Sequence, residues 1–487
     1  MYCTLFMSQD NLKEKVSKGL LWNTIHNLSM KGIQFLLMLF MARILTPEDY
    51  GTVGLLAIFI QLSNTFAESG FALALIRKQD RTQTDLSTAF YFNIAVAVFC
   101  YLVVYLIAPW VAVFYEKPII APLLRALALT IPISSLSTVL VAMMNYNMQF
   151  KKQAIISISH TITSGVAGLA MAVMGCGVWA LVGQSLVASC LGAILCWVLN
   201  RWHPSLEYSW KSFRELFGFS GKLLLTRIIE TIYGNIYSIV IGKVYSPSTL
   251  GHYTRAQNWA SLPSTNIVSI MNNVSFASLS KLQDDSEKLR RVYRKMMKTT
   301  AFVVCPLMFG LSAVSRPLIY FTIGTKWALC AQILQIICFM FLFLPLQSLS
   351  INLLQAMGRS DLSLRISIIG KVLSVIVLVS SLPFGIIPMC WLSVVSSVVI
   401  LAINLYYVGN LLNIGLFEQL KDLVPSFGLS SVMFLAVVLS VEMFTADWLK
   451  LVVGVSVGMG LYVGCAYVFK LKNLSDTLDV VRIMVHK

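Results

Sequence analysis

The chain has 487 residues, of which 57% are apolar and only 12% are charged, and its formal net charge is +16. Soluble domains are typically about 45–50% apolar and about 25% charged, so this composition excludes an ordinary water-soluble enzyme. Roughly 278 apolar residues would supply about fourteen membrane-spanning helices of about 20 residues each. In a membrane protein the excess of Lys and Arg indicates basic cytoplasmic loops, so no nucleic acid partner is expected.

Apolar stretches long enough to cross a bilayer recur along the chain, with short polar breaks between them. They are continuously apolar over about 20 residues, which favours helices over the alternating strands of a barrel. We therefore predict an all-α polytopic membrane protein with fourteen transmembrane helices. Their expected limits are 20–42, 51–76, 86–109, 121–144, 153–175, 178–199, 215–242, 252–279, 299–323, 330–357, 363–384, 387–409, 425–445 and 448–469. The first ten residues lack a signal-peptide pattern, so the first span is expected to direct insertion.

The distribution of the 37 Lys and Arg residues predicts the orientation of the chain in the membrane. With the N-terminus inside, 27 of them fall in inner loops and tails and eight fall in outer loops. The last two, Lys31 and Arg227, lie inside predicted spans. Because Lys and Arg are enriched in cytoplasmic loops, both termini are expected in the cytoplasm.

Two predicted outer turns repeat one pattern at an offset of 200 residues. Arg43 to Gly51 reads Arg-Ile-Leu-Thr-Pro-Glu-Asp-Tyr-Gly, and Lys243 to Gly251 reads Lys-Val-Tyr-Ser-Pro-Ser-Thr-Leu-Gly. The match indicates two six-helix lobes of the same orientation, although two unrelated turns that both favour Pro and Gly would look alike. The predicted organisation is an N-terminal lobe at 1–199, a cytoplasmic linker at 200–214, a C-terminal lobe at 215–409, and an extra helix pair with a cytoplasmic tail at 410–487.

Polar residues recur at helical spacing on the first two helices of each predicted lobe, which places them on one face of each helix. Lys31 lies about 16 Å into its span at 1.5 Å per residue, and Arg227 lies at a similar depth in its own. A charge there costs at least about 2.5–3.5 kcal/mol on insertion scales, so both are functional candidates. We predict that these faces line a central cavity. The candidate substrate-binding residues are Lys31, Arg227, Arg255, Asn23, Asn27, Gln34, Gln61, Asn64 and Gln257.

Each candidate charge also has a structural interpretation. Arg227 could pair with Glu230 three residues later, and Arg255 lies close enough to the outer end of its span to snorkel. Glu68 could be a packed partner of Lys31; Glu68 and Glu230 are also candidate sites for a coupling proton or cation. If the cavity is cationic, its ligand should be anionic, because guanidinium and ammonium groups both bind phosphate. The scattered cysteines form no C-x-x-C pair and no phosphate loop is complete, so neither a metal nor another cofactor is predicted.

Three segments carry a resemblance to a known family. They are Gly19-Leu-Leu-Trp22-Asn23, the turn from Arg43 to Gly51, and Glu68-Ser-Gly-Phe-Ala-Leu-Ala-Leu-Ile76. With the fourteen predicted spans, they resemble Wzx-type polysaccharide flippases, close to the colanic-acid exporter group of the multidrug/oligosaccharidyl-lipid/polysaccharide superfamily. The resemblance covers essentially the whole chain, and the Thr-Pro-x-x-Tyr-Gly turn is its most specific piece.

The resemblance implies a MATE/MOP-like fold and a transporter that is not an enzyme. Such proteins flip undecaprenyl-diphosphate-linked oligosaccharide from the inner to the outer leaflet of the bacterial inner membrane by alternating access. The product serves surface polysaccharide biosynthesis, such as O-antigen, capsule or exopolysaccharide, so a polysaccharide polymerase and glycosyltransferases are expected partners. Transport could be coupled to H⁺, to Na⁺ or to the membrane potential alone. The family carries no universal catalytic motif, so the candidate residues rest on the polar faces alone.

Three alternatives remain open at this point. A cation-coupled multidrug exporter of the same fold would need an acidic rather than a basic cavity. A membrane glycosyltransferase or polymerase would need large outer loops with catalytic groups, and no predicted loop exceeds about 25 residues. A scaffold protein that keeps the fold without transport is the third.

Overall fold

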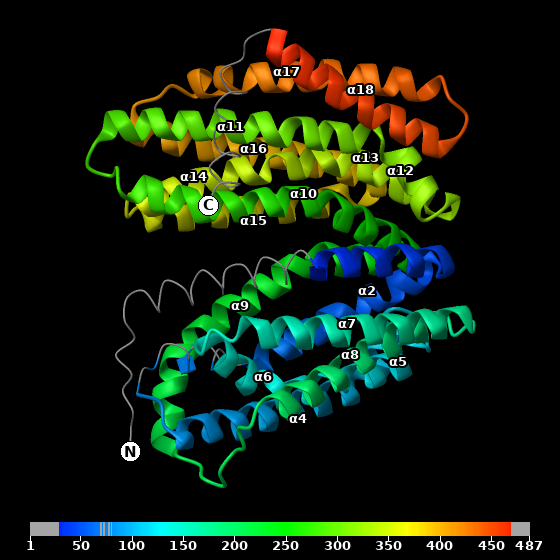
Figure 1. Ribbon diagram of the computed structural model, residues 1–487, viewed down its shortest axis with the longest axis vertical. Helices are drawn as coiled ribbons and strands as arrows, with labels where there is room; N and C mark the ends of the chain where they lie inside the picture. The colour runs from blue at the N-terminus through cyan, green and yellow to red at the C-terminus, as the bar shows by residue number, and fades with distance from the viewer. Residues whose placement is uncertain (1–28, 69–70, 72–73, 76–77, 79, 469–487) are drawn as a thin grey trace. The chain divides into compact units, whose positions relative to one another are not determined.

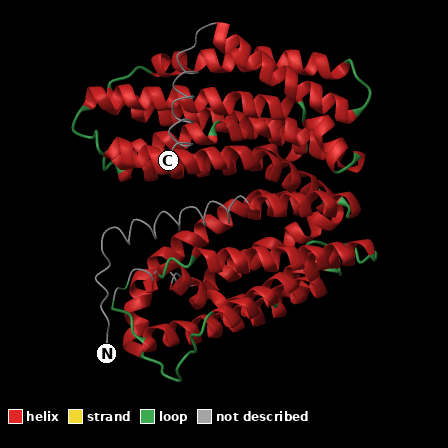
Figure 2. Ribbon diagram, viewed as in Figure 1, coloured by secondary structure: helices red, strands yellow, loops and turns green. Residues whose placement is uncertain are grey.

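The computed structural model describes residues 29–68, 71, 74–75, 78 and 80–468 of the chain. This part consists of long helices (Figure 1) and contains no strand (Figure 2). Its contacts divide it into two compact units, Met1–Gly251 and His252–Lys487. The all-α polytopic fold predicted from composition is confirmed, whereas the lobe boundaries predicted from the repeat stay a prediction.

Within the described ranges, the first unit contains a helix at residues 29–44, seven further helices whose bounds are given next, and the start of α10. They are α2 (Pro47–Glu68), α4 (Gln83–Phe114), α5 (Ile120–Ala128), α6 (Thr130–Tyr146), α7 (Phe150–Val173), α8 (Val178–Leu199), α9 (Trp210–Val244) and the first residues of α10 (Pro247–Ser280). The helix at 29–44 packs on α7, where the Thr161 hydroxyl contacts the Met30 sulfur at 3.7 Å.

The second unit contains the rest of α10 and the helices that follow it. They are α11 (Ser286–Ala313), α12 (Ser315–Thr322), the short 3₁₀ helix η1 (Thr325–Trp327), α13 (Ala328–Leu342), α14 (Leu344–Ala356), α15 (Ser360–Ser381), η2 (Leu382–Phe384), α16 (Ile386–Leu412), α17 (Leu416–Glu442) and α18 (Asp447–Val468). Helix α17 lies against both α11 and α18 (Figure 1).

Twelve helical segments in the described ranges are long and apolar enough to cross a membrane, against fourteen predicted spans. The predicted span at 20–42 is described only from residue 29 onward. The predicted span at 252–279 forms most of α10, a 34-residue helix whose many Ser, Thr and Asn residues keep it outside this apolar set.

Three predicted spans are each divided into two helices. The breaks fall at Leu129 between α5 and α6, at Val314 between α11 and α12, and at Phe343 between α13 and α14. In every case a proline lies in the first turn of the second helix, where its missing N–H has no intrahelical partner to lose. These prolines are Pro132, Pro317 and Pro345.

The two turns of the sequence repeat have the same local structure. Thr46 precedes α2 and accepts a hydrogen bond from the backbone N–H of Asp49 at 3.2 Å. Ser246 precedes α10 and accepts one from the backbone N–H of Thr249 at 3.0 Å. A hydroxyl cap followed by proline at the first helical position is a strong helix start, which explains why the pattern occurs at both places.

These two helix starts contact each other within the first unit. A Cβ atom added to Gly51 would overlap the backbone carbonyl oxygen of Pro247, and one added to Gly251 would overlap that of Pro47. Each glycine therefore permits a close approach of two backbones that no other residue would allow. The contact is reciprocal, as expected if the two turns are equivalent parts of a repeat.

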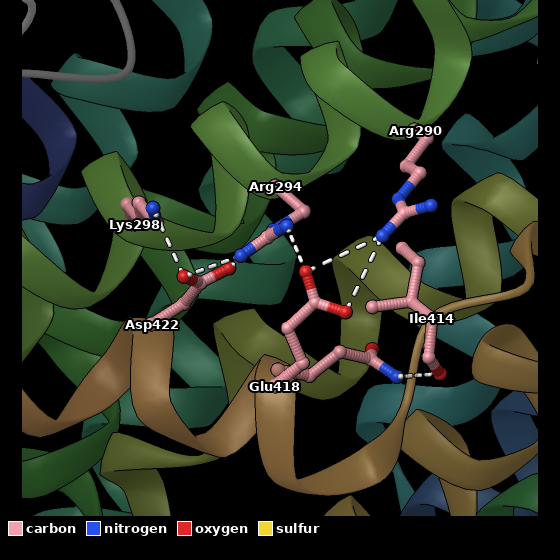
Figure 3. Close-up of polar contacts among 7 residues, drawn as sticks. Arg290, Arg294, Lys298, Ile414, Glu418 and Asp422 are labelled. Carbon is pink, nitrogen blue, oxygen red and sulfur yellow. Dashed lines mark hydrogen bonds and ion pairs between the residues drawn. The ribbon is translucent and has the colours of Figure 1, made fainter. Parts of the chain in front are cut away.

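In the second unit, an ion-pair network joins α17 to α11 (Figure 3). Arg294 lies between Glu418 and Asp422 and donates to both, with the Asp422 bonds at 2.6 and 2.9 Å. Arg290 donates to Glu418 at 3.3 Å, and Lys298 lies 2.9 Å from Asp422. The three cations are four residues apart, so one face of α11 receives the carboxylates of α17.

Candidate functional site

The polar faces predicted on α2 and α9 contact each other inside the first unit. Three side-chain pairs cross between the helices, and we call them the polar ladder. Its rungs are Gln61–Asn235 at 2.8 Å, Thr65–Thr231 at 3.2 Å and Glu68–Arg227 at 3.5 Å.

Helix periodicity explains why the rungs fall in register. The ladder residues of α2 follow one another after four and three positions, and those of α9 after four and four, so each set occupies one face. The α2 numbers rise as the α9 numbers fall, so the helices run antiparallel along the ladder. Polar side chains in a membrane span face protein or water rather than lipid, which makes this interface a candidate for the transport path.

The ion pair between Arg227 and Glu68 is long and exposed. The closest nitrogen–oxygen distance between Arg227 and Glu68 is 3.5 Å, and their side chains are 43% and 53% exposed. Ion pairs this exposed contribute only about 0–1 kcal/mol. A guanidinium has five N–H donors, so Arg227 retains most of its binding capacity for an anion.

The amide rung is more tightly organised. The Nδ2 group of Asn235 donates to Oε1 of Gln61 and to the backbone carbonyl oxygen of Thr231, each at 2.8 Å. Asn235 is half-buried, whereas Gln61 is exposed. The second bond ties the Asn235 side chain to its own helix, so its orientation is set before any ligand arrives.

The structure gives Arg227 a different partner from the one that the sequence suggested. We considered pairing with Glu230 on the same helix, but the carboxylate beside Arg227 is that of Glu68 on α2. Glu230 is exposed on α9. Asn235 is not among the residues predicted from the sequence, although its spacing of eight residues from Arg227 places both on one helical face.

The remaining candidates lie on other parts of the described chain. Lys31 and Gln34 are exposed on the helix at 29–44, and Asn64 is half-buried on α2. Arg255 and Gln257 are half-buried on α10, in the second unit. That these residues line one cavity with the polar ladder stays a prediction. Asn23 and Asn27 lie outside the described residues.

Hydrogen bonds join the predicted linker to α4 of the first unit before α9 begins. The backbone N–H of Ser205 donates to the Ser87 hydroxyl at 2.9 Å, and that of Ser209 donates to the Thr88 hydroxyl at 3.0 Å. Both acceptors are fully buried near the start of α4. The start of α9 is therefore held against α4, which fixes the helix that carries Arg227.

A lysine reinforces this attachment. Lys78 lies 3.0 Å from Asp85 of α4 and 3.0 Å from Glu215 of α9. Burial lowers the pKa of Lys78, but its hydrogen bonds to Glu215 and Asp85 outweigh that effect and leave the pKa raised. The ammonium group therefore stays charged and links the two helices. Across the described residues, no cluster of His, Cys, Asp and Glu could hold a metal ion.

Residues 40–332 match the family model described as "Polysaccharide biosynthesis protein". The matched residues make up more than half of the chain. The chain belongs to this family. It is 25% identical to the lipopolysaccharide biosynthesis protein WzxC of Escherichia coli over 74% of this chain and 73% of the relative. It is 26% identical to the teichuronic acid biosynthesis protein TuaB of Bacillus subtilis over 72% and 74%. It is 25% identical to the succinoglycan biosynthesis transport protein ExoT of Rhizobium meliloti over 64% and 63%.

Solved structures share the fold of this family member. The lipid II flippase MurJ in an inward closed conformation aligns with a TM-score of 0.72 at 16% identity, over 92% of this chain and 98% of that one. An inward-facing multidrug resistance MATE transporter of the MOP superfamily aligns with a TM-score of 0.61 at 13% identity, over 80% and 95%. The predicted MATE/MOP-like architecture is thus confirmed.

Proposed function

We propose that this protein flips an undecaprenyl-diphosphate-linked oligosaccharide from the inner to the outer leaflet of the bacterial inner membrane. The observation that carries the proposal is Arg227, an exposed and loosely paired cation in the polar ladder of a polysaccharide biosynthesis family member. The relatives named for lipopolysaccharide, teichuronic acid and succinoglycan biosynthesis support a role in surface polysaccharide production.

The diphosphate is the part of the substrate that Arg227 would hold. Guanidinium binds phosphate oxygens bidentately, and such charge-assisted hydrogen bonds are stronger than bonds between neutral groups. Glu68 competes for the same guanidinium only weakly, because the pair is long and exposed. Lys31, exposed on the helix at 29–44, would supply a second point charge. Arg255 is a third candidate, on α10.

The transport cycle follows from the proposed topology. Both termini lie in the cytoplasm, and two lobes alternate in opening the cavity to either side of the membrane. An anionic headgroup that moves outward is helped by an inside-negative potential, by about 2.3 kcal/mol per charge per 100 mV. Glu68 or Glu230 would carry a coupling H⁺ or Na⁺. A polysaccharide polymerase would consume the flipped product.

Charge removal tests the phosphate contact in cells that lack the native gene. The double variant Lys31→Ala, Arg227→Ala is expected to insert normally and to lose most surface polysaccharide, because the headgroup loses its counter-charges. Gln347→Leu, which alters a membrane amide in the second unit, is the insertion control. Normal export by the double variant would contradict the proposal, and drug resistance without any change in polysaccharide would favour a multidrug exporter instead.

A further inference from the structure

We propose, on the basis of the function proposed above, that Gln61 and Asn235 bind the sugar part of the substrate and determine specificity. The two carboxamides form a neutral rung of the polar ladder, in line with the charged rung that would hold the diphosphate. Neither carboxamide adds a charge that would serve the phosphate. Oδ1 of Asn235 is an acceptor that a deprotonated phosphate cannot pair with, so the rung suits a ligand that also carries a donor.

The Gln61–Asn235 pair uses only some of its hydrogen-bond donors and acceptors. Both N–H groups of Asn235 are used, one by Oε1 of Gln61 and one by the backbone oxygen of Thr231. Oδ1 of Asn235 and the two N–H groups of Gln61 make no further hydrogen bond within the described ranges. The rung therefore offers one acceptor beside two donors.

An adjacent donor and acceptor are complementary to a sugar. Vicinal hydroxyls supply both functions from neighbouring carbons, and an acetamido group supplies an N–H and a carbonyl oxygen. Because Asn235 is already fixed by two bonds, less side-chain freedom is lost when such a ligand binds. Gln61 is exposed and can turn its free N–H groups toward the ligand.

The position of the rung suits a glycan attached to the diphosphate. Gln61 and Glu68 are seven residues apart on α2, which separates them by about 10 Å along the helix. In the proposed topology α2 begins at the outer turn, so the amide rung lies on the outer side of Arg227. A diphosphate at Arg227 would then place a short oligosaccharide along the same face, within reach of the amides.

If the Gln61–Asn235 pair had a purely structural role, its removal would have a different effect on ligand binding. Hydrogen bonds between membrane helices contribute about 0.6 kcal/mol on average, so the pair could simply hold α2 against α9. In that case its loss would lower the thermal stability and weaken the binding of every ligand alike. A sugar-binding role instead affects only ligands that carry sugar.

The test uses the full-length protein in lipid nanodiscs and three probes: undecaprenyl diphosphate, undecaprenyl-diphosphate-glucose and undecaprenyl-diphosphate-N-acetylglucosamine. The wild type is expected to bind at least one glycosylated probe about tenfold more tightly than the bare diphosphate, as two neutral hydrogen bonds would give. Gln61→Leu and Asn235→Leu should each remove most of this gain and leave binding of the bare diphosphate unchanged.

Two further variants distinguish a failure of the proposed sugar contact from a failure of the proposed phosphate contact. The exchange Gln61→Asn with Asn235→Gln keeps a carboxamide on each helix and should retain the gain. Arg227→Gln should weaken all three probes, and unchanged binding of undecaprenyl diphosphate by this variant would refute the phosphate contact while leaving the sugar contact standing. The proposal is overturned if the wild type prefers neither glycosylated probe, if the gain survives both Leu substitutions, or if those substitutions weaken all probes equally.

Discussion

Arg227 is a charged residue of a candidate membrane span whose ion pair leaves its side chain 43% exposed. Its partner Glu68 comes from the neighbouring helix α2, at 3.5 Å and with both side chains well exposed. A pair of this kind reduces the cost of placing the cation in the span without holding it in a fixed hydrogen-bonded geometry. The sequence indicated the depth of Arg227, but not which carboxylate lies beside it.

Removing the carboxylate should therefore strengthen anion binding. Glu68→Gln leaves the shape of the ladder unchanged and frees the guanidinium from its competitor, so undecaprenyl diphosphate should bind up to about fivefold more tightly. Titration of the purified variant in nanodiscs with undecaprenyl diphosphate measures this change in affinity. Weaker binding than in the wild type would mean that Glu68 positions Arg227 instead of competing with the ligand.

Gly51 and Gly251, the glycines of the two repeated turns, should not tolerate a side chain. Gly51→Ala and Gly251→Ala each place a methyl group on a backbone carbonyl oxygen, which the neighbouring helix start must move to relieve. Overpacking of this kind costs typically about 1–3 kcal/mol. Thermal unfolding of the purified variants should show the loss. Gly234→Ala is the matched control, because a Cβ atom there meets open space; equal stability of all three would refute the close contact.

At the scale of elements, each unit is held by polar contacts between helices as well as by apolar packing. The first unit has the polar ladder between α2 and α9, and the second has the network of α11 with α17 (Figure 3). The second network joins the extra helix pair to the preceding helices. Asp422 is its most buried carboxylate, with 11% of its side chain exposed, and it serves both Arg294 and Lys298.

Asp422→Asn should destabilise the attachment of α17. The substitution removes the negative charge that two cations share, and breaking a part-buried charge pair typically costs about 1.5–3 kcal/mol. Thermal unfolding at low salt should detect the loss. Asp361→Asn is the control, because its pair with Arg359 is exposed on both sides and its loss should cost less than about 1 kcal/mol. Similar losses for both variants would contradict a stabilising role of the network.

The elements also show what the sequence could predict. Long apolar runs and helical spacing were enough to predict most of the helices and the polar faces of α2 and α9, because both are local properties. The helix limits were predicted less well, since α11 begins at Ser286 and α17 at Leu416, 13 and nine residues before the predicted spans. The prolines Pro132, Pro317 and Pro345 could have indicated the divided spans. The pairing of Arg227 with Glu68 could not be predicted, since it depends on which helices become neighbours. For the same reason nothing in the sequence indicated that the linker would be bound to α4.

For the molecule as a whole, the apolar composition indicates a membrane protein, and we propose that a few polar residues carry its function. The chain is 57% apolar, the polysaccharide biosynthesis family model matches residues 40–332, and the MATE/MOP-like fold is shared with MurJ over 92% of the chain. The proposed transport uses a small polar minority. An inside-negative potential would then help to drive an anionic headgroup outward.

Reconstitution tests the proposed flipping most directly. Purified protein is placed in liposomes whose inner leaflet carries an undecaprenyl-diphosphate oligosaccharide, and a membrane-impermeant glycosidase outside measures the sugar that becomes accessible. The wild type should expose the glycan far faster than protein-free liposomes, and Arg227→Gln should slow this at least tenfold. Exposure at the protein-free rate by the correctly folded wild type, with the glycolipid of its own host, would contradict the account.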